Sequence, residues 1–86
     1  MNAWPTIDMM ATGQNITNLM NQAGMTVRDI QNVFGFSNPQ AIYKWRRGQS
    51  VPTIDNLIVL AAVLKVKIDD IIVVDDVQEK SSVLIA

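Results

Sequence analysis

The 86-residue chain contains no histidine and no cysteine. These absences exclude zinc fingers, histidine-based metal sites, Ser-His-Asp and Cys-His nucleophiles and disulfide scaffolds. Two acidic pairs, Asp69-Asp70 and Asp75-Asp76, remain as candidates for acid-base or metal chemistry. Adjacent side chains point in different directions, however, and no further carboxylate converges on these pairs. We therefore expect no enzyme activity, no bound metal and no cofactor.

The chain also lacks long apolar runs. The longest, from Leu57 to Leu64, is far shorter than the roughly 18 residues that indicate a membrane span. The N-terminus has neither the basic nor the apolar region of a signal peptide. We expect a cytoplasmic protein without a membrane partner. Its length fits one small domain, which would gain stability from a partner subunit because so small a core is marginal alone.

The net charge of −1 hides a segregation of charge along the chain. Residues 28–67 carry six basic and two acidic residues, a net charge of +4, with the densest cluster at Lys44, Arg46 and Arg47. Residues 68–86 carry one basic and five acidic residues, a net charge of −4. Such asymmetry between segments is typical of proteins with a polyanionic partner.

Two short helices are predicted after an extended arm at residues 1–11. Helical spacing begins at Thr12, which we assign as the N-cap, and ends at Gly24. A second helix of about two turns runs from the N-cap Thr26 to Gly35. Asp29 lies near its positive end, where an acidic residue is favourable. Its inward-facing residues are predicted to be Ile30, Val33 and Phe34.

A third helix is predicted from Asn38-Pro39 to about Arg47. Asn38 is expected to cap it, and Pro39 suits the first helical position because the amide hydrogen that it lacks would be unpaired there. Ile42 and Trp45 lie three residues apart and are predicted to face inward. The other face carries polar or amphipathic side chains, namely Gln40, Tyr43, Lys44 and Arg47.

A fourth helix, capped by Thr53, is the most apolar segment and is expected to be the central core helix. The residues that make it so apolar are Ile54, Leu57, Ile58, Leu60, Ala61 and Leu64. A short fifth helix is predicted over residues 67–72. The β-prone pieces Val73-Val74 and Ser82–Ile85 allow a strand pair, a dimer arm or a disordered tail. We divide the chain into an arm (1–11), a domain (12–73) and an acidic, then apolar, tail (74–86).

The apolar residues at helical spacing in these five segments predict an all-α, five-helix domain. A short C-terminal extended or β segment can follow it. Its core is expected to contain Ile16, Leu19, Ile30, Phe34, Ile42, Trp45, Leu57, Leu60 and Leu64.

The second and third predicted helices have the organisation of a helix-turn-helix, in which the second helix enters the major groove of DNA. Gln can pair with adenine, while Lys and Arg can contact guanine or phosphate. Residues early in such a helix reach base edges and later ones meet the backbone. We therefore assign base contacts to Gln40, Tyr43 and Lys44. Phosphate contacts are assigned to Thr26, Arg28, Arg46 and Arg47, with the helix N-terminus beside Thr26 adding its amides.

Residues 12–73 resemble the Cro/repressor-like (XRE) helix-turn-helix family of bacterial transcriptional regulators. The motifs that carry the resemblance are Asn15-Ile16 with Leu19, Gly24-Met25-Thr26, Phe34-Gly35, Ile42-Tyr43-Lys44-Trp45, Arg47-Gly48, Val51-Pro52-Thr53, and Val66 with Ile68-Asp69-Asp70-Ile71. The resemblance implies five helices, sequence-specific binding to double-stranded DNA, and a homodimer on a palindromic operator. A small regulator of this kind is expected to act as a repressor.

Three positions depart from the family pattern. Val27 lies where many members carry a glutamine that braces the recognition helix and touches phosphate. Arg46 replaces an acidic residue, which removes an ion pair and adds a DNA-favouring charge. The turn before the third helix is one residue longer than the commonest form, so the first base-contacting position is either Asn38 or Gln40.

A second function class remains open. The apolar segment Val83-Leu84-Ile85 at the chain end could dock a protein partner, as in an antitoxin-like or accessory subunit. An enzyme is the least favoured class, because no convergent set of catalytic side chains is present.

Overall fold

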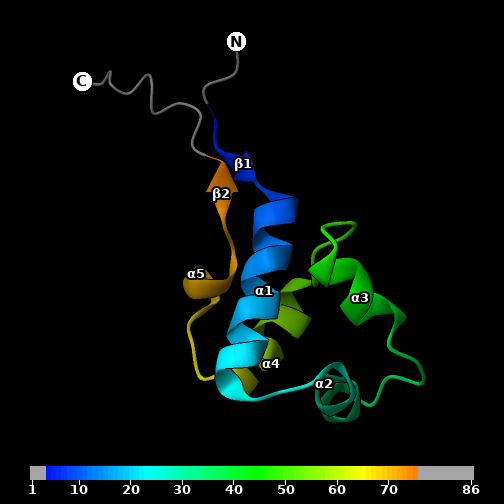
Figure 1. Ribbon diagram of the computed structural model, residues 1–86. Coiled ribbons are helices and arrows are strands. Elements are labelled where there is room, and N and C mark those ends of the chain that lie inside the picture. Colours follow the sequence, from blue (N-terminus) through cyan, green and yellow to red (C-terminus); the bar gives the residue numbers. More distant parts are fainter. Residues whose placement is uncertain (1–3, 76–86) are drawn as a thin grey trace.

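The computed structural model describes residues 4–75, which form five helices and a two-stranded ribbon. Helix α1 runs through the middle of the molecule, and the other helices pack around it (Figure 1). The all-α, five-helix prediction is confirmed, together with a short extended segment near each end. The elements are β1 (Thr6–Ile7), α1 (Met9–Ala23), α2 (Val27–Phe34), α3 (Gln40–Arg46), α4 (Ile54–Leu64), α5 (Ile68–Ile71) and β2 (Val74–Asp75).

Helix α1 begins earlier than the sequence pattern predicts. Its N-cap is Asp8, whose side chain accepts a hydrogen bond of 2.9 Å from the Ala11 amide, so the assignment of Thr12 as the cap is wrong. An aspartate at this position satisfies one of the unpaired amides of the first turn. Thr12 instead lies inside the helix and is 1% exposed.

The remaining helix ends follow local sequence signals. Gly24 and Gly35 both adopt the left-handed conformation, with φ of 70° and 71°, and end α1 and α2 as predicted. Thr26 and Thr53 cap α2 and α4 as predicted. Helix α3 is shorter than predicted: its N-cap is Pro39, so the assignments of Asn38 as the cap and of Pro39 as the first helical residue are wrong. The Asn38 side chain then accepts a 3.0 Å hydrogen bond from the Gln40 amide.

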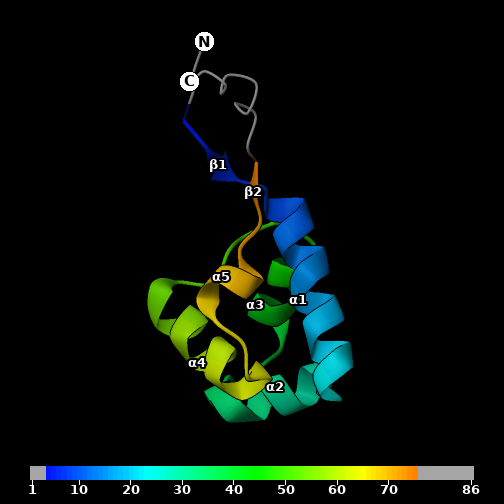
Figure 2. The same cartoon turned by 90° about the vertical axis from the view of Figure 1, so that its left-hand side faces the viewer.

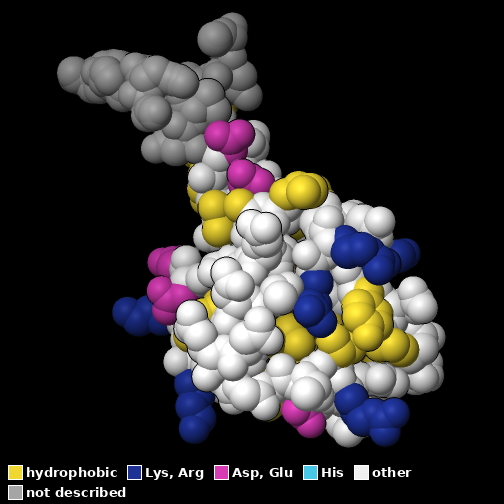
Figure 3. Space-filling view, viewed as in Figure 1, with side chains coloured by type: hydrophobic (Ala, Val, Ile, Leu, Met, Phe, Trp, Pro, Cys, Tyr) yellow, Lys and Arg dark blue, Asp and Glu magenta, His cyan; other side chains and the backbone are white. Residues whose placement is uncertain are grey.

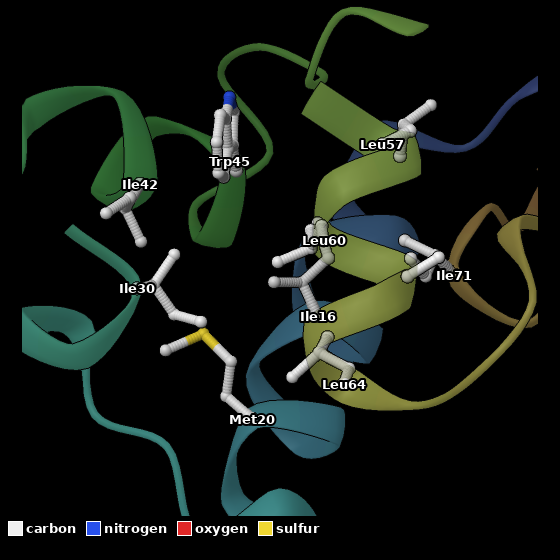
Figure 4. Packing of buried hydrophobic residues seen from close by; sticks show 10 residues of the cluster. Ile16, Met20, Ile30, Ile42, Trp45, Leu57, Leu60, Leu64 and Ile71 are labelled. Atoms are coloured by element: carbon white, nitrogen blue, oxygen red, sulfur yellow. The ribbon is translucent and has the colours of Figure 1, made fainter. Parts of the chain in front are cut away.

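The hydrophobic core joins all five helices (Figure 4). Seven predicted core residues are buried: Ile16, Ile30, Ile42, Trp45, Leu57, Leu60 and Leu64. Two more, Leu19 and Phe34, are partly buried against this cluster. Met20, Ala61 and Ile71 are also buried in it.

One residue predicted to face inward, Val33 on α2, is 47% exposed. On α4 the apolar residues Ile54 and Ile58 are 68% and 54% exposed. Helix α4 is apolar on nearly all sides, yet the three core positions predicted for it, Leu57, Leu60 and Leu64, are all buried. The structure buries the stripe of Leu57, Leu60, Ala61 and Leu64, which have the i, i+3, i+4, i+7 spacing of one helix face.

The two ends of the described chain meet in an antiparallel ribbon. Thr6 pairs with Asp75 and Ile7 with Val74. The ribbon projects beyond the start of α1, at the end of the molecule opposite α2 (Figures 1 and 2). The prediction that Val73-Val74 is β-prone therefore holds for Val74, but its partner is the N-terminal segment. The other β-prone piece, residues 82–85, lies outside the described residues.

Two polar side chains of α1 fasten the segment after α5 to the core. The Thr12 hydroxyl accepts a 2.9 Å hydrogen bond from the Val73 amide and donates one of 3.3 Å to the Val73 carbonyl. The Asn15 amide donates to the carbonyls of Asp70, at 2.6 Å, and Ile71, at 3.0 Å. They give partners to the Val73 amide and to the carbonyls of Asp70 and Ile71 after a four-residue helix, while the Val73 carbonyl also accepts a 2.8 Å hydrogen bond from the Asp8 amide.

Replacing Thr12 by valine should lower the free energy of unfolding by about 2 kcal/mol. Valine has nearly the same shape but leaves the amide and carbonyl of Val73 without this partner. Urea denaturation followed by circular dichroism measures the change. Thr53→Val removes only an exposed cap bond and should cost about half as much. Equal losses would show that the Thr12 bonds add nothing beyond a surface hydrogen bond.

Candidate nucleic-acid interface

Helices α2 and α3 are joined by a short turn, residues 35–39, with its own hydrogen bonds. The Gly35 amide donates to the Asn32 carbonyl at 3.2 Å, and the Phe36 amide donates to the Gln31 carbonyl at 3.1 Å. The Gln31 side-chain amide donates back to the Phe36 carbonyl at 3.2 Å. The turn is therefore tied to the last turn of α2 by both backbone and side chain.

Three aromatic rings hold α3 against this turn. Phe34 and Phe36 are stacked, with ring centroids 5.0 Å apart. Trp45, from α3, meets both rings edge-on at 5.6 and 6.1 Å. Offset-stacked and edge-to-face pairs each add about 0.5–1.5 kcal/mol beyond the area that they bury. The predicted packing role of Trp45 is confirmed, and the rings fix the angle between α2 and α3.

The outer face of α3 carries the residues that the sequence predicts for it. Gln40, Tyr43, Lys44 and Arg47 are all exposed, whereas Ile42 and Trp45 point into the core. The Arg47 guanidinium lies 5.9 Å from the centre of the Tyr43 ring. This cation–π contact lies between two exposed side chains of the outer face. Asn38 is also exposed, but its side-chain oxygen accepts the hydrogen bond from the Gln40 amide just before α3.

Arg46 differs from the other basic residues of this region. It is half-buried, and its Nε donates a 3.1 Å hydrogen bond to the Thr17 hydroxyl of α1. The sequence pattern grouped Arg46 with Arg28 and Arg47, both of which are exposed. No local signal could separate them, because Thr17 is 29 residues away in the chain.

The N-terminus of α2 is closed by a capping box. The Thr26 hydroxyl accepts a hydrogen bond from the Asp29 amide at 3.1 Å, and the Thr26 amide donates to the Asp29 carboxylate at 2.8 Å. The backbone and then the side chain of Thr26 hold the pKa of Asp29 below its ordinary value. An incoming phosphate would therefore meet a carboxylate at this helix end, beside the exposed Arg28.

Replacing Asp29 by asparagine should destabilise the protein at neutral pH but have little effect in acid. A carboxyl group with a lowered folded-state pKa contributes stability above its unfolded pKa of about 3.9, and that stability is lost as the pH falls through the folded value. Thermal unfolding of both proteins across this range measures the difference. A gap between the two proteins that stays constant at all pH values would contradict the role of the charge.

Charge is unevenly distributed over the surface (Figure 3). Lysine and arginine side chains lie over α2 and α3, on the right of this view, around a patch of apolar side chains. Acidic side chains lie along the ribbon and beside α5, where further basic side chains project. Within residues 4–75, no group of three or more acidic side chains is placed to hold a metal ion. The described helices include none that is long and apolar enough to cross a membrane.

Two glycines bring α1 close to the end of α3: Gly13, which the sequence interpretation did not use, and Gly48, which it used only as a family motif and helix stop. A Cβ atom on Gly13 would collide with the carbonyl oxygen of Trp45 and lie 2.7 Å from that of Arg46. A Cβ on Gly48 would lie 2.8 Å from the Met10 Cα. A glycine inside a helix is an available signal of close packing, since it costs helix stability and needs a reason.

Residues 16–71 match the family profile described as Helix-turn-helix. The chain therefore belongs to the Cro/repressor-like (XRE) helix-turn-helix family, as its motifs indicated. It is a DNA-binding transcriptional regulator and not an enzyme.

A solved structure has a similar fold: the restriction-modification controller protein C.AhdI from Aeromonas hydrophila. The TM-score is 0.66, the sequence identity is 20%, and the match covers 74% of this chain and 96% of the other. At this identity the similarity concerns the fold alone. No curated protein sequence matches the chain significantly.

Proposed function

We propose that the protein binds a specific double-stranded DNA sequence by inserting α3 into the major groove. The observation that carries the proposal is the exposed outer face of α3, which presents Gln40, Tyr43, Lys44 and Arg47 while Ile42 and Trp45 anchor the helix from behind. A helix of about 10–12 Å diameter fits the major groove of B-DNA. The rigid turn and aromatic cluster support a fixed angle of entry.

Base edges are contacted by residues near the start of α3, and the backbone by residues around it. We assign base contacts to Asn38, Gln40, Tyr43 and Lys44, with the side-chain NH₂ of Asn38 as the donor because its oxygen already accepts the Gln40 amide. Phosphate contacts are assigned to Arg28, Arg47 and Arg46. Thr26 is a weaker phosphate contact than we expected, since its hydroxyl and amide are both engaged by Asp29.

The protein acts as a homodimer on a palindromic operator and represses transcription. Two observations support a dimer. One α3 of seven residues spans only a few base pairs, and two-fold symmetric pairs are the usual way to lengthen such a site. Helix α4 exposes the apolar side chains of Ile54, Ile58 and Val59, outside the α2–α3 unit. As a regulator of bacterial genes, it works in the cytoplasm.

The same exposed α4 residues are compatible with a protein partner, the second candidate function. The apolar segment Val83-Leu84-Ile85, which motivated an antitoxin-like or accessory subunit, lies outside the described residues. Light scattering on the full chain and on a version ending at Val74 separates the alternatives. A dimer in both supports a homodimer through the folded domain, whereas a monomer in both contradicts the homodimer.

Titration of the full chain against the DNA upstream of its own gene, at several salt concentrations, tests the function. Neutralising about 4–6 phosphates per subunit gives a logarithmic salt slope of about −4 to −5 per subunit. Binding that does not respond to salt would contradict the proposal.

Gln40→Ala and Arg47→Ala should affect DNA binding in different ways. Loss of a base contact costs about 1–3 kcal/mol and relaxes sequence preference at one position, whereas loss of a phosphate contact weakens all sequences alike and lowers the salt slope by about 1. Selection of preferred sequences from a randomised library, followed by salt titration, measures both quantities. Identical effects of the two substitutions would overturn these role assignments.

A further inference from the structure

We infer that Arg46 acts on DNA binding indirectly, as a positioning residue that fixes the C-terminal end of α3 against α1 through Thr17. The inference rests on the proposed function and replaces a direct phosphate contact of Arg46. The exposed Arg28 and Arg47 keep their phosphate assignments.

The side chains form a short chain of hydrogen bonds from α3 into α1. Arg46 Nε donates to Thr17 Oγ1 at 3.1 Å, and the Thr17 hydroxyl donates to the Gly13 carbonyl at 3.0 Å. The hydroxyl therefore accepts one bond and donates the other. The only hydrogen of the Thr17 hydroxyl is used by the Gly13 carbonyl, so the oxygen of that hydroxyl is oriented to accept from Arg46.

The backbones of the two helices touch at the same place. Gly13 has no Cβ, and one added there would lie 2.7 Å from the Arg46 carbonyl oxygen. Gly13 thus lets α1 approach the last turn of α3 and also accepts the hydrogen bond that orients Thr17. One small region of α1 holds both the backbone and the side chain of Arg46.

Helix α3 needs such an anchor because it has only seven residues. Isolated helices shorter than about 12 residues are marginal in water, so α3 depends on its tertiary contacts. The aromatic cluster and Asn38 hold its beginning and middle, whereas Arg46 holds its end. If the end were released, ordering it again on specific DNA would cost affinity, while loose contacts to phosphate would be little affected.

The partner of Arg46 is neutral, which makes the role testable. Helix α1 contains no Asp or Glu between Met9 and Ala23, so Arg46 is not neutralised by an ion pair there. Lysine at position 46 keeps the charge but lacks the planar Nε donor. A direct phosphate contact tolerates lysine better than this hydrogen bond does.

The test compares Thr17→Val, Arg46→Lys and the double variant in the full chain. The probes are a short duplex that the unmodified protein enriches from a randomised library, and a shuffled duplex of the same composition. Each single variant should lower the preference for the enriched duplex about fivefold, the effect expected for one hydrogen bond. The double variant should be no worse than either single one, and all salt slopes should equal that of the unmodified protein.

Thr12→Val is the matched control, because it makes the same chemical change on the same helix. Thr12→Val removes hydrogen bonds to Val73 and none to α3. It should therefore lower the midpoint of thermal unfolding without changing the preference for the enriched duplex over the shuffled one. Three results would overturn the inference: a preference for the enriched duplex unchanged by Thr17→Val, a preference unchanged by Arg46→Lys, which is what a direct phosphate contact would give, or an equal loss of preference in Thr12→Val. A library that yields no enriched duplex would overturn the proposed function and this inference with it.

Discussion

Replacing Trp45 by alanine should lower the free energy of unfolding by about 4 kcal/mol. Trp45 is 4% exposed and contacts both Phe34 and Phe36, so the substitution removes a large buried ring and two edge-on aromatic contacts at once. Domains of this kind have a total stability of about 5–15 kcal/mol, so the variant should keep only a fraction of it. Urea denaturation at a fixed protein concentration measures the loss.

Tyr43→Ala is the matched control for Trp45→Ala, because the two aromatic residues lie on opposite sides of the same helix. Tyr43 is 39% exposed, and its removal costs the contact with Arg47, about 0.5–1 kcal/mol at an exposed site. We expect Tyr43→Ala to stay folded and to bind DNA less well, and Trp45→Ala to lose binding through unfolding. If both substitutions destabilised the protein equally, the assignment of one face of α3 to the core and the other to DNA would be wrong.

Replacing Gly13 by alanine should lower the free energy of unfolding by about 3 kcal/mol, the upper range for overpacking. Helix propensity alone predicts the opposite, since alanine is about 1 kcal/mol better than glycine inside a helix. The added methyl group, however, would meet the backbone carbonyls of Trp45 and Arg46, which cannot turn away as a flexible side chain could. Propensity would raise the free energy of unfolding and overpacking would lower it. The sign of the measured change therefore shows which effect is larger.

Gln14→Ala is the control for Gly13→Ala, because Gln14 is the next residue of α1 and is exposed. It should leave stability unchanged within about 0.5 kcal/mol. Thermal unfolding of both variants, under the same conditions, separates packing from propensity. A Gly13→Ala protein that is more stable than the unmodified one would show that α1 and α3 are not in close contact.

Much of the fold could be predicted from the sequence because its helix ends are local features. Thr26 with Asp29, Thr53 and the glycines Gly24 and Gly35 each act within one turn of the helix that they limit. The exposed face of α3 was predictable for the same reason, since the position of Ile42 and Trp45 fixes the opposite side of the helix.

The start of α1 was misplaced because the local cap signal of Asp8, one turn before Thr12, was not used. Other features depend on residues far apart in the chain, as when the Thr12 hydroxyl bonds Val73, 61 residues away. The pairing of Ile7 with Val74 likewise joins the two ends of the described chain. Such contacts have no local sequence signal.

The candidate site shows the same limit. Arg46 and Arg47 are neighbours in the sequence with the same side chain and charge. Residue type therefore could not show that they have different surroundings. Their different surroundings follow from the path of α1 past the end of α3, where Thr17 meets Arg46 while Arg47 lies over Tyr43. The internal glycine of α1 was the one signal that the two helices touch there.

The central claim, that α3 binds DNA, is tested most directly by a titration of the isotope-labelled full chain with the duplex enriched from a randomised library, followed by backbone amide chemical shifts. We expect the largest changes in the segment from Asn38 to Arg47, with smaller ones near Arg28. The amides of α5 (Ile68–Ile71), beside the acidic side chains in Figure 3, should stay unchanged. Large changes confined to α4 and α5, with α3 unaffected, would contradict the claim.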